Sequence, residues 1–444
     1  MLESIREQLN HPSDLYGETL NNDLITMELC YFPSLCDQQL IKDGLLVPFT
    51  YRFDPVEFER MINSNPAFSK ADQPELWTEL LLKGTLLFKI HDQVYRYGVQ
   101  KKWQDKPDTN QIEASLQGPQ SALTEDLDMN ISLCRLRYNE PTLCVEQHII
   151  GQASKTRITV LYDKNLVNSN VLRLLYSRLP HVTLKILRAA GQLSQELSER
   201  KHRLFPTILQ TERPDRIATM IERGKIALLM DGSRFALILP VRLFDFMHAM
   251  DDDYDVYWMS KFLILLRYFA MCLSVTLPSL YIAFVSYNPE VLRVQLTLSI
   301  AGSRVVVPYP SFIEVFVMMF MIEALYEASL RLPRYIGSTA TTVGGLILGQ
   351  AIQQAGLVSS IMIIVTSAVA ISNFVIPNNG FGNSIRFIKY IFVFISIFYG
   401  LIGVVICFVA LIIYWCNLRS FGQPYLALFI PKNEAAAHHH REER

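Results

Sequence analysis

Two long stretches in the second half of the chain carry no charged side chain. No Asp, Glu, Lys, Arg or His occurs from Gly337 to Ile385 or from Tyr390 to Leu418. A helix crosses a bilayer with about 20 consecutive apolar residues. The first stretch is therefore long enough for more than one crossing, and the second for one long, tilted crossing. We predict a helical transmembrane domain over residues 256–419, with helices at 260–285, 310–334, 337–356, 357–376 and 387–417.

The first half of the chain has a different pattern, with short apolar or β-branched runs, polar loops and short amphipathic helices. Parts of this pattern occur twice. ELCYFPSLCDQQLI (28–41) matches ITVLYDKNLVNSNVL (158–172) at an offset of 131 positions, with Tyr31 opposite Tyr162. ELWTELLLKGTLLFKIHDQVY (75–95) matches DRIATMIERGKIALLMDGSRF (215–235) at an offset of 140, with Gly84 opposite Gly224. Two matches in the same order predict two similar α/β subdomains.

These patterns define the expected fold class. It is a multidomain membrane protein, with an N-terminal soluble α/β region of two similar subdomains and a C-terminal all-α polytopic transmembrane domain. The expected boundaries are subdomain 1 at 1–100, a linker and charged helix at 101–154, subdomain 2 with a membrane-proximal segment at 155–255, and a C-terminal tail at 420–444 after the transmembrane domain.

Composition narrows the class of protein. The formal net charge is −1 and no basic patch with interleaved aromatic residues occurs, so nucleic acid is not an expected partner. The seven cysteines form no CxxC pair, which argues against a zinc site or a disulfide framework and fits a reducing compartment. No P-loop or HExxH motif occurs, and GGLILGQ (344–350) follows no strand. We therefore expect no enzyme, no catalytic residues, no cofactor and no metal site.

The orientation in the membrane follows from the chain start and from the basic clusters. The N-terminus, MLESIREQLN, lacks the basic start and apolar core of a signal peptide, so the α/β region is expected to be cytoplasmic. Basic clusters beside membrane helices also favour the cytoplasm. The clusters at 331–334, 386–389 and 419–432 cannot all lie inside under simple alternation, unless 337–356 is re-entrant or 310–331 lies on the membrane surface. We expect both chain ends inside.

The segment 337–356, GSTATTVGGLILGQAIQQAG, is uncharged but rich in small, hydroxyl and amide residues. On a helix its polar and small positions fall within about 80° of one another, and Ile352 lies within that stripe. In one interpretation the stripe lines a pore and Ile352 acts as a dewetting gate. In the other, the glycines form a packing seam between helices and the polar side chains bond across it. The candidates are Ser338, Thr342, Gly345, Gly349, Ile352 and Gln353.

Four charged residues fall inside or beside the expected membrane helices: Arg267, Glu314, Glu323 and Glu327. Carboxylates within a membrane are functional by default, and rings of them favour cations. The alternative is an interfacial amphipathic helix whose acids face water. Glu323 and Glu327 share a helix face, and Glu314 points the opposite way. Arg267 is available to pair with one of these acids, and the sequence does not say which.

Several sequence blocks occur in an order typical of one protein family. They are GPQSALTEDLDMNISLCRLR (118–137), TERPD (211–215), DGSRFALILP (231–240), RLPRYIG (331–337), VGGLILGQA (343–351), AGLVSS (355–360), NFVIP (373–377) and SFGQPYL (420–426). With these blocks, the chain resembles the A subunit of the GerA-type spore germinant receptors of endospore-forming bacteria. The resemblance covers nearly the whole length.

The resemblance implies a multi-pass protein of the spore inner membrane that works with a transporter-like, nutrient-binding B subunit and a lipoprotein C subunit. It also implies a homo-oligomeric ring, expected to be pentameric, around a central pathway that releases monovalent cations such as potassium. This favours the pore interpretation of 337–356. Two other functions stay open: a non-conducting structural or signalling subunit of the receptor, and the family's stage-V paralogue linked to dipicolinate release.

Overall fold

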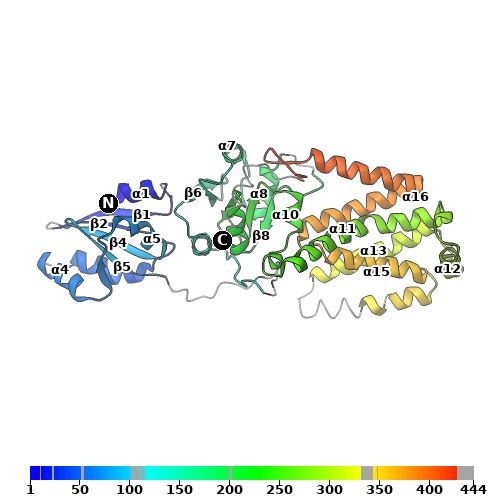
Figure 1. Cartoon of the computed structure of the whole chain (residues 1–444), viewed down its shortest axis with the longest axis horizontal. Coiled ribbons are helices and arrows are strands. Elements are labelled where there is room, and N and C mark those ends of the chain that lie inside the picture. Colours follow the sequence, from blue (N-terminus) through cyan, green and yellow to red (C-terminus); the bar gives the residue numbers. More distant parts are fainter. Residues whose placement is uncertain are drawn as a thin grey trace.

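The computed structural model describes residues 1–427, except 11, 23–24, 52–54, 102–109, 111–112, 114, 116, 200–202, 332–343 and 348. Its parts follow one another along a long axis: a first α/β unit, a second α/β unit and a helical bundle (Figure 1). The N-terminus lies in the first unit.

The first α/β unit is built on an antiparallel sheet of order β1-β2-β4-β5-β3. Its strands are β1 (Tyr16–Asn22), β2 (Ile25–Tyr31), β3 (Phe68–Lys70), β4 (Thr85–Ile90) and β5 (Gln93–Gly98). Its helices are α1 (Leu2–Gln8), α2 (Gln38–Ile41), α3 (Val47–Tyr51), α4 (Pro55–Ser64) and α5 (Trp77–Leu82). Strand β4 is buried on both faces because helices pack on each side of the sheet.

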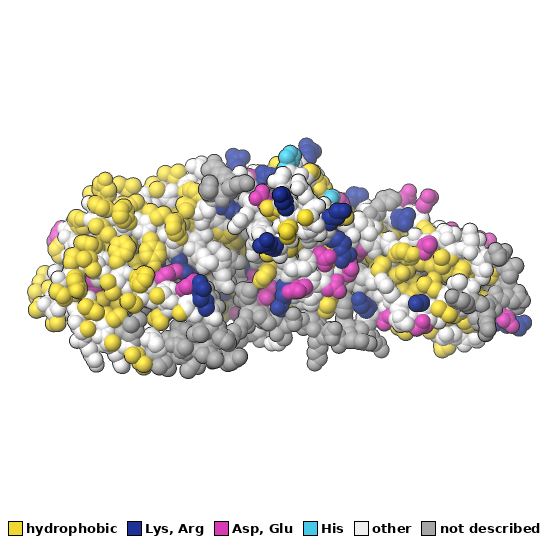
Figure 2. All heavy atoms as spheres, turned by 180° about the vertical axis from the view of Figure 1, so that it is seen from behind, with side chains coloured by type: hydrophobic (Ala, Val, Ile, Leu, Met, Phe, Trp, Pro, Cys, Tyr) yellow, Lys and Arg dark blue, Asp and Glu magenta, His cyan; other side chains and the backbone are white. Residues whose placement is uncertain are grey.

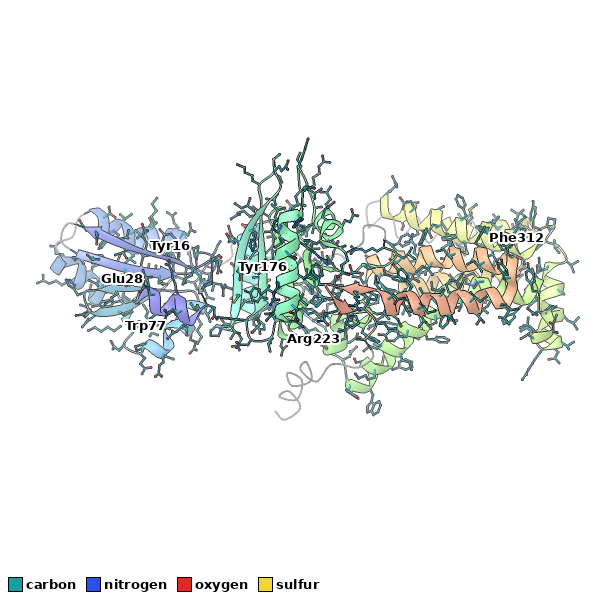
Figure 3. The ribbon with its side chains drawn as sticks, turned by 90° about the horizontal axis from the view of Figure 1, so that it is seen from above. Tyr16, Glu28, Trp77, Tyr176, Arg223 and Phe312 are labelled. Carbon is teal, nitrogen blue, oxygen red and sulfur yellow. The ribbon has the colours of Figure 1, made fainter. Side chains whose placement is uncertain are left out.

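The second α/β unit repeats this topology, with a sheet of order β6-β7-β9-β10-β8. Its strands are β6 (Leu143–Ile150), β7 (Thr156–Asp163), β8 (Leu209–Thr211), β9 (Ile226–Met230) and β10 (Ala236–Leu239). Its helices are α6 (Leu127–Arg137), α7 (Ser169–Arg178), α8 (Ala190–Leu197), α9 (Pro214–Glu222) and α10 (Leu243–Met247). Tyr176 on α7 donates a hydrogen bond to Glu146 on β6 and ties that helix to the sheet (Figure 3).

The shared strand order confirms the internal duplication that the sequence predicted. Strand β2 corresponds to β7, and the α5–β4–β5 segment corresponds to α9–β9–β10. Gly84 and Gly224 end the two matched helices at φ of 77° and 74°, a left-handed conformation that favours glycine. Equivalent glycines therefore stop equivalent helices before equivalent hairpins.

The boundaries of the second unit differ from those that the sequence pattern indicated. Strand β6 and helix α6 lie within 101–154, which was expected to be a linker with a charged helix, yet β6 pairs along its whole length with β7. At the other end, Tyr425 is fully buried, and the Ser420 hydroxyl accepts from the Val241 backbone N–H and donates to the Thr207 carbonyl. The chain after the last apolar helix thus packs onto the second unit, through a small hairpin of β11 (Arg419–Ser420) and β12 (Gln423–Pro424).

The helical bundle contains α11 (Tyr257–Ser286), α12 (Val294–Arg304), α13 (Ser311–Arg331), a helical segment at 344–347 and 349–354, α15 (Ser360–Phe374) and α16 (Asn379–Asn417). Helices α11 and α16 are long and apolar enough to cross a membrane. On the face that Figure 2 shows, hydrophobic side chains dominate the surface of this part, in contrast to the mixed surface of the second unit. Helix α12 was not predicted.

Helix α16 is a hairpin of two helices, not one long rod. Phe381 near its start and Trp415 near its end each lie 5.4 Å, between ring centroids, from the same ring of Phe205. A straight helix would separate these two residues by about 51 Å. The backbone reverses at Gly400, where φ is 54° and ψ is −136°. The expectation of one long, tilted crossing over 387–417 was therefore wrong, because a single left-handed glycine ends the first arm.

Contacts fix the direction of each arm. Tyr281 near the end of α11, Glu314 near the start of α13 and Ser359 before α15 lie together at the end far from the α/β units, where Figure 3 also places Phe312. Glu323 of α13 pairs with Arg386 of the first α16 arm nearer the second unit. Arg331 ends α13 and Arg386 lies in the first two turns of α16, so both belong to the α/β end of the bundle. Because α16 folds back at Gly400, Arg419 after its second arm returns to the same end.

Candidate functional site

The predicted pore-lining residues do not all lie on one side of the described helix. Ile352 is buried inside the chain, in a cluster with Met318 and Met362. Gln353 is exposed, and its Nε2 donates to the Ser360 hydroxyl at 3.3 Å. A Cβ placed on Gly349 would meet nothing within 4 Å in the described part of the chain. The outward-facing part of the stripe is thus formed by Gly349 and Gln353.

The other three candidates are placed less fully. A Cβ on Gly345 would lie 3.9 Å from Leu325 Cδ1 of α13, so this glycine allows close packing of the two helices. Ser338 and Thr342 lie outside the described residues. The packing-seam interpretation therefore fits Gly345. Gln353 is exposed in the single chain, so in a membrane either another subunit or water would have to contact its amide.

Glu314 is fully buried at the far end of the bundle, so the alternative that placed its carboxylate in water was wrong. Its Oε1 accepts a hydrogen bond of 2.5 Å from the Ser359 backbone N–H, and its Oε2 lies 3.3 Å from the Tyr281 hydroxyl. Arg304 of α12 faces the same carboxylate at 3.5 Å. One acidic side chain of α13 therefore joins four elements, because α11 and the residue before α15 donate hydrogen bonds to it and α12 supplies an ion pair.

Glu323 and Glu327 have different surroundings, although both lie on α13. Glu323 forms an ion pair with Arg386, whose guanidinium also stacks over Tyr326 at 3.8 Å from the ring centroid. Glu327 is exposed and pairs at 2.7 Å with Arg331, one helical turn later. Glu323 thus belongs to a contact between helices, and Glu327 to a surface pair of the kind worth about 0–1 kcal/mol.

Arg267 pairs with none of these glutamates, contrary to the pairing considered from the sequence. Its guanidinium binds the Asp252 carboxylate and the Met247 carbonyl, the latter at 3.2 Å. Asp252 lies in the short turn before α11 and is 5% exposed. Three consecutive acidic residues, Asp251–Asp253, form this turn, and it points the middle carboxylate inward.

The second unit and the bundle share one continuous hydrophobic core. Phe205 and Phe246 from the α/β side stack against Phe381 of α16, at 5.4 and 5.6 Å between ring centroids. Tyr425 packs on Phe246 at 6.1 Å. Phe205 also lies 5.4 Å from Trp415, near the end of the second arm of α16. Buried apolar area stabilises by about 25 cal/mol per Å², so these five rings hold the second unit to both arms of α16.

Buried ion pairs hold α9 and α10 together within the second unit, and sequence reasoning missed them. Arg216 binds Glu113 at 3.0 Å and the Asp245 carbonyl at 2.9 Å. Lys225 lies 2.5 Å from the Asp245 carboxylate. Burial alone would raise the pKa of Asp245, but the Lys225 charge outweighs it and the pKa lies below its usual value. The TERPD block (211–215) was the available signal, since its Arg213 pairs with Asp215 at 2.6 Å beside this network.

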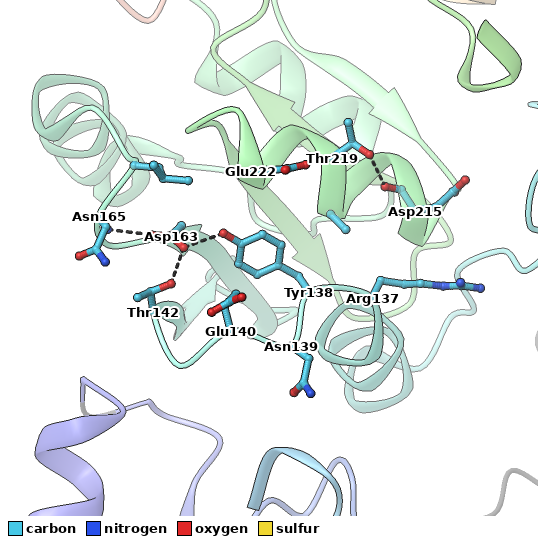
Figure 4. A pocket seen from close by; sticks show the side chains of 12 residues that line it. Arg137, Tyr138, Asn139, Glu140, Thr142, Asp163, Asn165, Asp215, Thr219 and Glu222 are labelled. Carbon is cyan, nitrogen blue, oxygen red and sulfur yellow. Dashed lines mark hydrogen bonds between the residues drawn. The ribbon is translucent and has the colours of Figure 1, made fainter. Parts of the chain in front are cut away.

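An open cleft lies on the second unit, lined by residues from α6, β7 and α9 (Figure 4). Asp163 at its wall accepts hydrogen bonds from the Tyr138 and Thr142 hydroxyls and the Asn165 backbone N–H. Burial, followed by the bond to Asp163, raises the pKa of Tyr138. No cluster of three metal-ligating side chains occurs among the described residues. Asp163 already accepts three hydrogen bonds from its neighbours, so its role in this cleft is to stabilise the fold.

The architecture defines a class of membrane-associated protein: two similar α/β units, the second of which shares a hydrophobic core with an apolar helical bundle. Residues 3–440 match the family of the Bacillus/Clostridium GerA spore germination protein, and the chain belongs to that family. A role in spore germination follows.

Individual relatives agree with this. The chain is 36% identical to spore germination protein B1 of Bacillus subtilis (strain 168), over 72% of this chain and 66% of that protein. It is 29% identical to spore germination protein GerLA of Bacillus cereus, over 97% of this chain and 90% of that protein. A similar solved structure is the N-terminal domain of the A subunit of the Bacillus megaterium spore germinant receptor GerK3, at 25% identity and a TM-score of 0.39, covering 54% of this chain and 92% of that one. The match thus spans about two thirds of the first relative.

Proposed function

We propose that the chain is the A subunit of a nutrient germinant receptor in the spore inner membrane. In this role it forms a ring of identical subunits, expected to be pentameric, and works with a transporter-like B subunit and a lipoprotein C subunit. The family membership supports the receptor, and the solved N-terminal domain with a related sequence belongs to an A subunit of such a receptor.

The positions of the basic residues support an orientation with both α/β units in the cytoplasm. Basic residues beside membrane helices favour the cytoplasmic side. The hairpin at Gly400 adds one crossing, so that Arg331, Arg386 and Arg419 all lie toward the α/β end without a re-entrant segment. The conflict between the basic clusters and the count of crossings therefore disappears.

In the proposed ring, the 337–356 segment lines a central pathway for monovalent cations. The observation that carries this is the outward-facing amide of Gln353, one helical turn after Gly349 and toward the far end of a bundle whose surface is largely apolar. A polar side chain on a lipid-facing apolar surface must face protein or water. Several copies of this face around an axis would enclose water. Ser338, Thr342 and Gly345 continue the stripe along the sequence, and Ile352 supports it from inside the chain.

The test is potassium release from liposomes that contain the purified full chain. Gln353→Leu should change the release rate at least several-fold, because it replaces the polar group that faces the pathway. Gln354→Leu is the matched control, since its neighbouring exposed amide lies about 100° away from the stripe. Ile352→Ala should increase the leak by loosening the packing behind the stripe.

Equal release from all four proteins, with the oligomer shown to be intact, would contradict a conducting stripe. Absence of any release would favour the non-conducting signalling subunit. In that case the same measurement with B and C subunits present decides whether this chain conducts only in the complete receptor.

A further inference from the structure

The middle of the bundle holds more positive than negative charge. Glu323 lies 12 residues from the start of α13, and Lys389 lies 11 residues before the turn at Gly400. Both are therefore about 17 Å from the far end of the bundle. A hydrocarbon core is about 30 Å thick, so this charged group lies near mid-depth of the proposed membrane.

Lys389 is 2% exposed and carries its ammonium group into this region. In the part of the chain that the structure describes, its nitrogen has no hydrogen bond and no ion pair. Glu323, which already pairs with Arg386, also attracts this ammonium, and the ring centroid of Tyr390 lies 5.6 Å from its nitrogen. One carboxylate thus serves two cations. A buried charge without a partner costs several kcal/mol, so such groups in a membrane pair, lose their charge or bind a ligand.

Arg386 lies one helical turn before Lys389 on the same face. One of its terminal nitrogens binds Glu323, and the other donates to Asn383 at 3.2 Å. Its Nε is buried and makes no hydrogen bond to any described residue. Two neighbouring cationic side chains thus each have a donor directed at no protein acceptor.

The charges of this group do not cancel. Arg386 and Lys389 carry two positive charges and Glu323 carries one negative charge, which leaves an excess of one. A bound monovalent anion would make the site neutral and would accept from both free donors, whereas a divalent anion would reverse the imbalance. The phosphates of lipid head groups lie outside the hydrocarbon core, so the depth excludes them.

We propose that Arg386 and Lys389 form a binding site for a small monovalent anion of the chloride type inside each subunit. Glu323 lies at the edge of the site and competes with the anion for Arg386. This site goes beyond the proposed pathway along 337–356 and does not depend on conduction by the ring.

The test uses the purified full chain in detergent at constant ionic strength, with gluconate replaced stepwise by chloride. Binding to the folded state alone raises the free energy of unfolding by RT ln(1 + [chloride]/Kd), so the unfolding midpoint keeps rising with the logarithm of the chloride concentration above Kd. We expect a rise of about 2–4 °C over the titration for the wild type. Chloride-35 line broadening, reversed by bromide, gives a second readout of direct binding.

Three variants and a matched control make the test specific. Lys389→Met should abolish both the rise and the broadening, and Lys389→Arg should retain them. Glu323→Gln should reach the same rise at a lower chloride concentration, because the competing carboxylate is gone. Lys261→Met removes an exposed lysine of α11 and serves as the matched control, which should behave as the wild type.

The proposal is overturned if the unfolding midpoint and the chloride-35 line width of the wild type do not depend on chloride. A full response to chloride in Lys389→Met would overturn it as well. If Lys389→Met fails to fold, the Glu323→Gln shift in chloride concentration still decides the matter. If Glu323→Gln needs as much chloride as the wild type for the same rise in midpoint, the result counts against the site. A loss of the chloride response in Lys261→Met would count against it as well.

Discussion

Tyr287, the residue after α11, fills the space beside Gly400 where α16 reverses. A Cβ on Gly400 would lie 2.9 Å from Tyr287 Cγ, closer than real side chains approach. The Tyr287 hydroxyl also donates to the Ile397 carbonyl, the last turn before the reversal. Space and backbone conformation therefore both require glycine at this position.

Replacing Gly400 by alanine should destabilise the protein by more than the 1–2 kcal/mol that a left-handed conformation costs an L-residue. The clash with Tyr287 adds to that cost. The measurement is the thermal unfolding midpoint of the purified chain in detergent. Gly349→Ala is the control, because the space around it is open among the described residues. Equal midpoints for both variants would show that α16 does not turn at Gly400.

The hairpin also makes a prediction about topology. Cys416, near the end of α16, is exposed and should react with a membrane-impermeant maleimide from the side on which protease removes the α/β units. Burial raises the pKa of Cys30 and Cys36 to about 12, so these thiols stay protonated and slow to react at pH 8. A straight α16 would instead place Cys416 on the opposite side. Labelling from that opposite side is the result that would refute the hairpin.

Phe205→Ala should uncouple the second α/β unit from the bundle. Removing a buried phenylalanine costs about 3–5 kcal/mol, and here the lost ring contacts both arms of α16. Calorimetry should show one unfolding transition for the wild type and two for Phe205→Ala, one for the α/β unit and one for the bundle. The adjacent Leu204→Ala is the control, because Leu204 is 39% exposed. A single unshifted transition in Phe205→Ala would mean that the joint is not rigid.

Asp245→Asn should cost about 3–5 kcal/mol at pH 7, because it leaves Lys225 buried without its partner. The pKa of Asp245 is lowered in the folded chain. Between that value and the unfolded value near 3.8, the unfolded chain binds more protons, so stability rises with pH and is lost as pH falls through this window. Unfolding midpoints from pH 2 to pH 7 should therefore converge for the two proteins at the acid end. A constant difference would argue that the carboxylate is not ionised in the fold.

Glu314→Ala should destabilise the far end of the bundle by about 3 kcal/mol, because it leaves the Ser359 N–H and Arg304 without their acceptor. Glu327→Ala removes an exposed acid and should cost about 0–1 kcal/mol. Hydrogen exchange at the start of α15 should rise in the first variant and stay unchanged in the second. Equal exchange in both would place Glu314 outside the hydrogen-bond network.

Local pattern was enough to predict the duplication and most of the helices. The matched glycines, Gly84 and Gly224, end amphipathic helices in both copies, and such stop signals depend on a few neighbouring residues. Charge-free stretches predicted the apolar bundle, because a helix that crosses a bilayer needs about 20 consecutive apolar residues and such a run can be read from the local sequence. Strand β6 was missed because it is an edge strand whose second half, residues 146–149, is mostly polar and partly or fully exposed.

What the sequence by itself determined is the order of units, their class and the residues that must avoid water. Only the tertiary structure decided which charge meets which partner: Arg267 with Asp252, Glu323 with Arg386, and Lys389 with no described acceptor. It also decided that α16 folds back, since Gly400 is one of several glycines in an apolar run and the contact with Tyr287 comes from a distant segment. Pairing of this kind depends on distances between chain segments far apart in sequence, which no local pattern contains.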